Sequence, residues 1–335
     1  MPTNRQFVLA QRPDGVPSDD TFDLVETDVP APGPREVLVR TRYLSVDPYM
    51  RGRMRARESY AEPWVVGAVL RGGVVGEVVE SNHPAYAPGD AVTGNLEWAD
   101  YAVADGDALV RVETGDLPES YALGVIGMPG RTAYFGVTDV LDPDPGDTVV
   151  VSAAAGAVGS VAGQIAGLNG CRVVGVAGSD EKVGYLEDDL GFDVGINYAE
   201  ANVGDALADA APDGVDGYYD NVGGEITDAV FGHLRVRASV AVCGQIALYN
   251  EEGVSVGPRK LGTLVEKRAR VEGFLVSDYA PRFGEATERL RAWVDSGEVS
   301  VRETVTDGLE NAPSAFVGLF EGENVGKQLV RVGGE

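Results

Sequence analysis

The chain has 335 residues, of which 53 are acidic and 27 are basic, and its formal net charge is −26. This length exceeds one ordinary core and predicts two domains, while the negative field argues against nucleic acids and anionic membranes as partners. The only lysines are Lys182, Lys260, Lys267 and Lys327. This acid-rich, lysine-poor composition indicates a high-salt cytosol, where charges are screened within about 3 Å at 1 M salt. The alternative is an acidic protein that works under ordinary salt conditions.

The first third of the chain, from Phe7 to about Val110, has the pattern of an all-β domain. Residues Glu36–Tyr43 alternate as a strand, and Gly67–Glu80 indicates a pair of strands punctuated by glycine. A turn at Pro88–Val92 leads into another strand, and Trp98–Val103 adds one more. Short strands separated by Gly and Pro predict a small barrel.

The middle of the chain, from about Tyr121 to Val276, alternates strands and helices, which predicts a parallel, doubly wound sheet. Apolar periodicity marks helices ending at Gly191 and at Pro212, and a further short helix after Gly224. The expected strands are Thr148–Val151, Cys171–Ala177, Val194–Tyr198, Gly217–Val222, Ser239–Cys243 and Arg270–Val276.

The first of these units, Thr148–Gly178, is a β-strand, a turn of small residues, a helix and a second strand. The turn contains AAGAVG, so that Ala154, Gly156 and Gly159 stand where a dinucleotide-binding fingerprint has its three glycines. The helix has one apolar stripe, formed by Val158, Val161, Ile165 and Leu168.

The chemistry of such a turn is that of a phosphate cradle. Gly156 has no Cβ, so the backbone can approach a pyrophosphate closely, and the helix N-terminus offers N–H groups and partial positive charge to the anion. Gly159 and Gly163 lie on one helix face and are expected to let the helix pack tightly on its strand. Because Ala154 replaces the first glycine, a tight turn without a ligand stays open as the alternative.

The last part of the chain is expected to fold back on the barrel. It contains a helix at Pro281–Ser296, a strand at Val299–Val305, a helix at Pro313–Phe320 and a strand at Gln328–Val332.

The chain contains two cysteines, Cys171 and Cys243, both in predicted buried strands, which is typical of a reducing compartment. Residues Met1–Gly15 have no apolar signal region, and no run approaches the roughly 20 apolar residues of a membrane span. These features predict a cytoplasmic protein. The only histidines, His83 and His233, are expected to be structural or solvated, so a catalytic zinc is not expected. A serine hydrolase is not expected either, because neither histidine has an evident catalytic partner.

Seven ordered motifs carry a resemblance to the zinc-free medium-chain dehydrogenases/reductases, within them to the alkenal/prostaglandin reductase and curcumin reductase branch. The resemblance covers nearly the whole chain. The motifs are LSVDPYMRGRM (Leu44–Met54), GMPGRTAYFG (Gly127–Gly136), SAAAGAVGSVAGQ (Ser152–Gln164), DNVGGE (Asp220–Glu225), CGQIALYN (Cys243–Asn250), GFLVSDY (Gly273–Tyr279) and GENVGKQLV (Gly322–Val330).

The resemblance implies an α/β fold, with a Rossmann doubly wound parallel sheet plus a GroES-like β-barrel domain. Residues 1–120 and 290–335 would form the GroES-like catalytic domain and residues 121–289 the NADP-binding domain. It implies a homodimer, NADP(H) as cofactor, no metal, and reduction of the carbon–carbon double bond of small α,β-unsaturated aldehydes and ketones. The alternatives are an NADPH-dependent quinone oxidoreductase and a non-catalytic NADPH-binding protein.

The resemblance also assigns residues to the cofactor and the substrate. Tyr249 and Tyr49 would face the substrate, Tyr249 being the first candidate to stabilise the enolate through its O–H, with the ribose hydroxyl or water as other proton donors. Lys182 and Tyr198 would bind the adenosine 2′-phosphate. The remaining cofactor residues would be Met128, Gly156, Ala157, Val158, Gly159, Asn221, Cys243, Gly244, Gln245, Ile246, Ala247, Leu248, Phe274, Leu275, Val276 and Asn324.

The spacing of these residues leaves the cofactor choice open. Asn221 and Cys243 fall at carboxyl ends of predicted strands, where open α/β sheets bind ligands. The second strand of the βαβ unit ends at Gly178 rather than at the acid that favours NAD, yet Asp180 and Glu181 follow soon after. The resemblance favours NADP.

Other charged residues near the motifs have no assigned role. Arg51 and Arg53 near Tyr49 are expected to be surface charges. Arg131 occupies a position that is often apolar in the family, and the substrate remains open because it depends on the loops Arg51–Trp64 and Asn250–Gly262.

Overall fold

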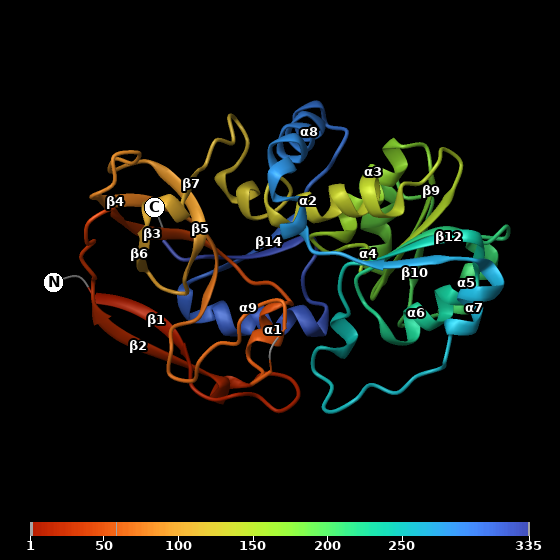
Figure 1. The fold of residues 1–335 in the computed structure, drawn as a ribbon, viewed down its shortest axis with the longest axis horizontal. Helices are drawn as coiled ribbons and strands as arrows, with labels where there is room; N and C mark the ends of the chain where they lie inside the picture. The colour runs from red at the N-terminus through yellow and green to blue at the C-terminus, as the bar shows by residue number, and fades with distance from the viewer. Residues whose placement is uncertain (1–2, 58, 334–335) are drawn as a thin grey trace. The chain divides into compact units, whose positions relative to one another are not determined.

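The computed structural model describes residues 3–57 and 59–333 and divides into two compact units (Figure 1). The segment Met1–Gly15 and the loop Arg51–Trp64 are therefore described only in part, because residues 1–2 and 58 lie outside the described residues. Unit 1 consists of Met1–Leu123, Glu303–Asn324 and Gln328–Glu335, and unit 2 consists of Gly124–Arg302 and Val325–Lys327.

Unit 1 is built from two antiparallel sheets. Strands β1 (Thr3–Leu9) and β2 (Phe22–Asp28) form the smaller one, and the larger has the order β14-β15-β3-β4-β5-β7, with β6 also pairing with β3. Its strands are β3 (Glu36–Ser45), β4 (Arg71–Ser81), β5 (Ala91–Glu97), β6 (Tyr101–Asp105), β7 (Val110–Arg111), β14 (Glu303–Asp307) and β15 (Lys327–Arg331).

The predicted pair of strands within Gly67–Glu80 is wrong, because β4 runs without interruption through its glycines. These glycines allow neighbouring atoms to approach instead of breaking the strand. A Cβ on Gly76 would lie 2.5 Å from the carbonyl oxygen of Arg40, and one on Gly72 would lie 2.7 Å from the Met50 side chain.

The core of unit 1 gathers around Trp98, which is fully buried. Its ring stacks on Phe22 at 6.4 Å and meets the edge of Phe316 at 6.2 Å. Phe316 belongs to α9 (Ala312–Glu321), so the late helix and β15 return to the barrel as predicted. The expected strand at Val299–Val305 begins only at Glu303, because residues 299–302 belong to unit 2.

Unit 2 contains a six-stranded sheet in the order β10-β9-β8-β11-β12-β13, with every neighbouring pair parallel. Counted from β8, this is the 3-2-1-4-5-6 order of the Rossmann fold, and its order reverses between β8 and β11. The strands are β8 (Thr148–Ser152), β9 (Arg172–Ala177), β10 (Val194–Asn197), β11 (Val215–Asp220), β12 (Leu234–Val242) and β13 (Arg270–Gly273).

Helices cover both faces of this sheet (Figure 1). Strand β8 is buried along its whole length, because helices lie on both of its sides. The predicted apolar stripe of α3 is wrong at Leu168, which is 40% exposed, whereas the polar Ser160 and Gln164 are buried. The helices are α2 (Met128–Phe135), α3 (Gly159–Leu168), α4 (Asp180–Gly184), α5 (Val203–Ala210), α6 (Gly224–Phe231), α7 (Leu261–Lys267) and α8 (Phe283–Ser296).

Within the described residues, no helix combines the length and the apolar character that crossing a membrane requires.

Candidate nucleotide-binding and catalytic site

The turn between β8 and α3 is closed around backbone atoms. Ala153 has a positive φ of 46°, and its carbonyl oxygen accepts the N–H of Gly156 at 2.9 Å. A Cβ on Gly159 would lie 2.3 Å from that same oxygen, so only glycine fits there. Ala154 replaces the first fingerprint glycine without obstruction, because its methyl group packs against Gly175, which lacks a Cβ.

The N-terminus of α3 faces this turn and meets the requirements of a pyrophosphate cradle. The Ser160 N–H donates to the Gly156 carbonyl at 3.0 Å and begins the helical hydrogen bonding, so the preceding N–H groups are those that a helix start leaves for a ligand. Gly163 makes room for Phe192, which precedes β10. A Cβ there would lie 1.9 Å from the ring of Phe192, so Gly163 accommodates that ring.

A segment from the end of the chain completes the turn. The N–H of Gly326 donates to the carbonyl of Ala155 at 2.7 Å, and Gly326 forms a parallel bridge with Gly156. Local sequence gave no signal for this contact beyond the GENVGKQLV motif. Asn324, two positions earlier, is grouped with unit 1.

The residues expected at the adenosine end of the cofactor lie beyond β9. Tyr198 follows β10, and its phenol oxygen lies against Gly178, where a Cβ would be only 2.8 Å away. Lys182 belongs to α4, whose N-cap Ser179 accepts the Lys182 N–H at 3.3 Å. Partial burial lowers the pKa of Lys182 below its usual value, while the neighbouring Glu181 raises it.

The order of the sheet reverses between β8 and β11, and there Asn221 connects the carboxyl ends of the two strands by hydrogen bonds. Its side-chain amide donates to the Ser152 carbonyl at 2.8 Å, and its N–H donates to the Ser152 hydroxyl at 2.9 Å. The end of β12 joins them through Cys243 and Gly244, whose N–H groups both donate to the Asp220 carbonyl, at 2.8 and 3.1 Å.

Asp220 is a residue of this site that sequence reasoning passed over, although it opens the DNVGGE motif. Its side chain is completely buried and fixes the strand end through five hydrogen bonds. The donors are the hydroxyls of Tyr218, Ser152 and Thr227 and the N–H groups of Val222 and Gly223, at 2.8 to 3.3 Å.

The loop after β12 folds over this strand end. The N–H groups of Ile246 and Ala247 donate to the carbonyls of Asn221 and Val222, at 3.3 and 3.1 Å. Leu248 ends the single turn of helix, and Tyr249 follows it. The loop thus holds the predicted residues Cys243–Tyr249 against the carboxyl ends of β11 and β12.

Burial controls the protonation of two side chains in this loop. It raises the pKa of Tyr249 above the usual value, so the phenol keeps its proton at neutral pH. It also raises the pKa of the Cys243 thiol to about 12, which leaves that cysteine in its unreactive protonated form.

The other predicted cofactor residues of unit 2 lie on two elements. Phe274 follows β13, and its ring meets the edge of Tyr219 at 6.3 Å, while Leu275 and Val276 lead into the next turn of helix. Met128 begins α2 and is 39% exposed.

Tyr49 belongs to unit 1, at the start of α1 (Met50–Arg53). Burial raises its pKa, and the nearby Asp47 adds to this effect. The expectation that Arg51 is a surface charge is wrong. It is 2% exposed and donates to the carbonyls of Gly15 and Pro13, and burial lowers its pKa to about 10. Arg53 is half-buried over the ring of Trp64.

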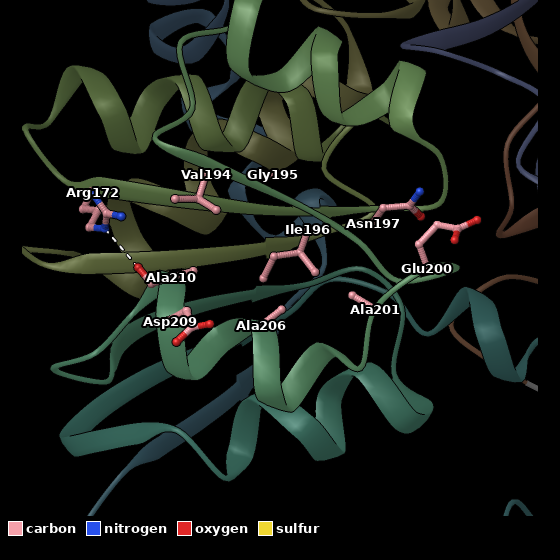
Figure 2. A pocket seen from close by; sticks show the side chains of 10 residues that line it. All are labelled: Arg172, Val194, Gly195, Ile196, Asn197, Glu200, Ala201, Ala206, Asp209 and Ala210. Atoms are coloured by element: carbon pink, nitrogen blue, oxygen red, sulfur yellow. Dashed lines mark hydrogen bonds between the residues drawn. The ribbon is translucent and has the colours of Figure 1, made fainter.

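A separate surface pocket of about 390 Å³ lies between β10 and α5 (Figure 2). It includes Arg172, which donates to the Ala210 carbonyl at 3.1 Å, and the acids Glu200 and Asp209. None of the predicted site residues lines it. No three His, Cys, Asp or Glu side chains come together as metal ligands within residues 3–57 and 59–333.

Comparison with known proteins agrees with this geometry. Residues 5–112 match the family model "N-terminal domain of oxidoreductase", and residues 157–292 match the model "Zinc-binding dehydrogenase". The chain is 49% identical to a putative NADP-dependent oxidoreductase of Bacillus subtilis, over 98% of both chains. It is 48% identical to the NADPH-dependent curcumin reductase of Escherichia coli, over 99% of this chain and 98% of the relative.

A solved structure gives the same result. The complex of CurA with NADPH from Vibrio vulnificus is 44% identical, covers 99% of this chain and 100% of its own, and superposes with a TM-score of 0.94. The chain belongs to the medium-chain dehydrogenase/reductase family, in the zinc-free branch of NADP-dependent alkenal and curcumin reductases. It is an NADP-dependent oxidoreductase, and its cofactor is NADP(H).

Proposed function

We propose that the protein reduces the carbon–carbon double bond of α,β-unsaturated aldehydes and ketones. The observation that carries this proposal is the half-buried phenol of Tyr249 at the carboxyl end of the sheet, whose raised pKa keeps it protonated. The 48% identity to an NADPH-dependent curcumin reductase supports the same substrate class. When bound, NADPH supplies the hydride for the β-carbon of the enone.

The turn at Gly156–Gly159 is proposed to hold the pyrophosphate, and Asn221 with residues Cys243–Tyr249 the nicotinamide end. Lys182 and Tyr198 would bind the 2′-phosphate. Since a hydrogen bond to a charged group contributes about 1.5–3 kcal/mol, these two together would contribute about 3–6 kcal/mol in favour of NADPH over NADH.

The proposed catalytic work of the chain is to stabilise charge on the substrate oxygen. As the β-carbon gains a hydride, the carbonyl oxygen becomes an enolate, and a fixed O–H donor lowers the energy of that state. Tyr249 is the first candidate for this donor and Tyr49 the second. Raised pKa values suit both, because each phenol stays protonated and can donate.

The test is turnover in high salt with NADPH and either 2-alkenals, aryl enones or quinones. Saturated aldehydes or ketones must appear as products, identified by mass spectrometry. Consumption of NADPH with quinones only would assign the enzyme to quinone reduction, and NADPH binding without consumption would leave a non-catalytic binding protein.

We also propose a homodimer in a reducing, cytoplasmic compartment. A reducing compartment is supported by Cys171 and Cys243, which form no disulfide. The dimer is supported by β13, an edge strand whose four residues are all exposed, and by the exposed apolar residues Leu261 and Val265 of α7. Light scattering should give twice the chain mass, and Val265→Glu should lower it.

A further inference from the structure

Two acids directly precede the lysine that would bind the 2′-phosphate. Asp180 and Glu181 directly precede Lys182 on α4. An acid after the second strand of such a sheet serves the ribose hydroxyls of NAD, and its charge would repel a phosphate. The structure gives each acid a partner. The side-chain amide of Asn197 donates to Asp180 at 2.8 Å, and the guanidinium of Arg302 lies 3.4 Å from the Glu181 carboxylate.

Arg302 is held in place by more than this ion pair. Its guanidinium lies over the ring of Tyr185, 5.5 Å from the centroid. Its carbonyl accepts the Lys327 N–H at 3.0 Å and leaves no room for a side chain on Gly326, where a Cβ would lie 1.8 Å away. The residue therefore connects α4 with the segment that closes the pyrophosphate turn.

The segment of residues 299–302, called the strap below, carries Arg302 and is fixed at its backbone. The side chain of Gln164 on α3 accepts the Ser300 N–H at 2.7 Å and donates to the Ser300 carbonyl at 3.0 Å. Val299, at the other end of the strap, is buried. Removal of the Arg302 side chain should therefore leave the strap in position.

We propose that Arg302 is a specificity-determining residue, which neutralises Glu181 so that the site beside Lys182 accepts a 2′-phosphate. The inference rests on the NADP site proposed above. The pair itself is exposed, at 46% and 72% of the two side chains, and exposed pairs contribute little to folding. Its effect on local charge is more important, because the chain carries a net charge of −26 and opposes any polyanion.

The experiment is calorimetric binding of NADPH, NADH, 2′,5′-ADP and 5′-AMP to the wild-type protein and to Arg302→Ala. We expect the variant to bind NADPH and 2′,5′-ADP about three- to tenfold more weakly in dilute salt, with less than a twofold change for the two ligands without the 2′-phosphate. In about 2 M KCl the loss should shrink below twofold, because salt screens Glu181.

The matched control is Arg235→Ala. Arg235 also pairs with an acid, Asp216, at 2.9 Å and is 48% exposed, but Asp216 lies at the amino end of β11, the opposite edge of the sheet. The control removes the same charge and should leave the ratio of NADPH to NADH affinity unchanged. Arg302→Lys should retain the preference for NADPH.

The double variant Arg302→Ala/Glu181→Gln separates charge from structure. It should recover the wild-type affinity for NADPH to within about twofold, because the unneutralised carboxylate is gone. Equal weakening of all four ligands, failure of this rescue, or a wild-type protein without preference for NADPH would each overturn the inference. Absence of enone turnover with normal binding would overturn only the proposed activity.

Discussion

The phenol oxygen of Tyr249 accepts the backbone N–H of Gln245 at 3.3 Å. A phenol that accepts an N–H still carries its own proton, and the bond it accepts polarises its O–H. Because burial also raises the pKa of Tyr249, the hydroxyl is better suited to donate a hydrogen bond than to act as a base. This arrangement suits the stabilisation of an enolate oxygen.

Tyr249→Phe should therefore impair the chemical step rather than cofactor binding. Loss of one such donor lowers kcat by about 10²–10³-fold in other enzymes. We expect a fall of this order for enone reduction, with the NADPH Kd unchanged by fluorescence titration. Tyr49→Phe is the comparison variant, and an equal kcat for wild type and Tyr249→Phe would remove Tyr249 from the mechanism.

Gly159→Ala should abolish tight NADPH binding, because its Cβ would lie 2.3 Å from the Ala153 carbonyl and force the turn to open. Gly167→Ala is the matched control in the same helix. Its Cβ would meet only Val173, at 3.9 Å, so it should raise the free energy of unfolding by about 0.5–1 kcal/mol. Chemical denaturation and NADPH titration measure both effects. Normal NADPH affinity in Gly159→Ala would argue against the cradle.

Lys182→Ala should weaken the binding of NADPH far more than that of NADH, since only NADPH carries the 2′-phosphate. The pH dependence follows from the lowered pKa of Lys182. As pH rises, the lysine loses its positive charge at a lower pH than an ordinary lysine does, so NADPH affinity should begin to fall below the usual pKa of lysine while NADH affinity stays level. In Lys182→Ala this difference should disappear. Equal weakening of both cofactors would refute the phosphate role.

Salt should stabilise the folded protein. With a net charge of −26, repulsion among the acids opposes folding in dilute salt, and screening within about 3 Å at 1 M relieves it. Thermal unfolding followed by circular dichroism should show a midpoint that rises with KCl. Sucrose is the control, because it favours compact states without screening charge; an equal rise in sucrose would count against the electrostatic interpretation.

The sequence predicted the parallel sheet well because its strands are apolar and buried on both faces. Val149, Val150 and Val151 of β8 are all fully buried, so their pattern reported their environment directly. The prediction of two strands at β4 is wrong because glycine usually interrupts a strand, whereas here it does not. Gly76 is needed there for contact with the Arg40 carbonyl, which belongs to another strand, and local sequence does not contain that information.

The candidate site, too, could be predicted from the sequence only where its contacts are local. The turn at Gly156–Gly159 could be recognised because each glycine acts on its immediate neighbours. The partners of Arg51 and Glu181 could not, because the carbonyls of Pro13 and Gly15 and the guanidinium of Arg302 come from distant segments. A charge whose partner is remote looks like a surface charge in the sequence.

The contact of Gly326 with Ala155 has a consequence for biosynthesis. All six strands of the parallel sheet are translated before residue 274, but the residue that closes the pyrophosphate turn follows near the end of the chain. A nascent chain still on the ribosome can thus assemble its sheet while its phosphate-binding turn is incomplete. We therefore expect tight cofactor binding to begin only after Gly326 has been synthesised.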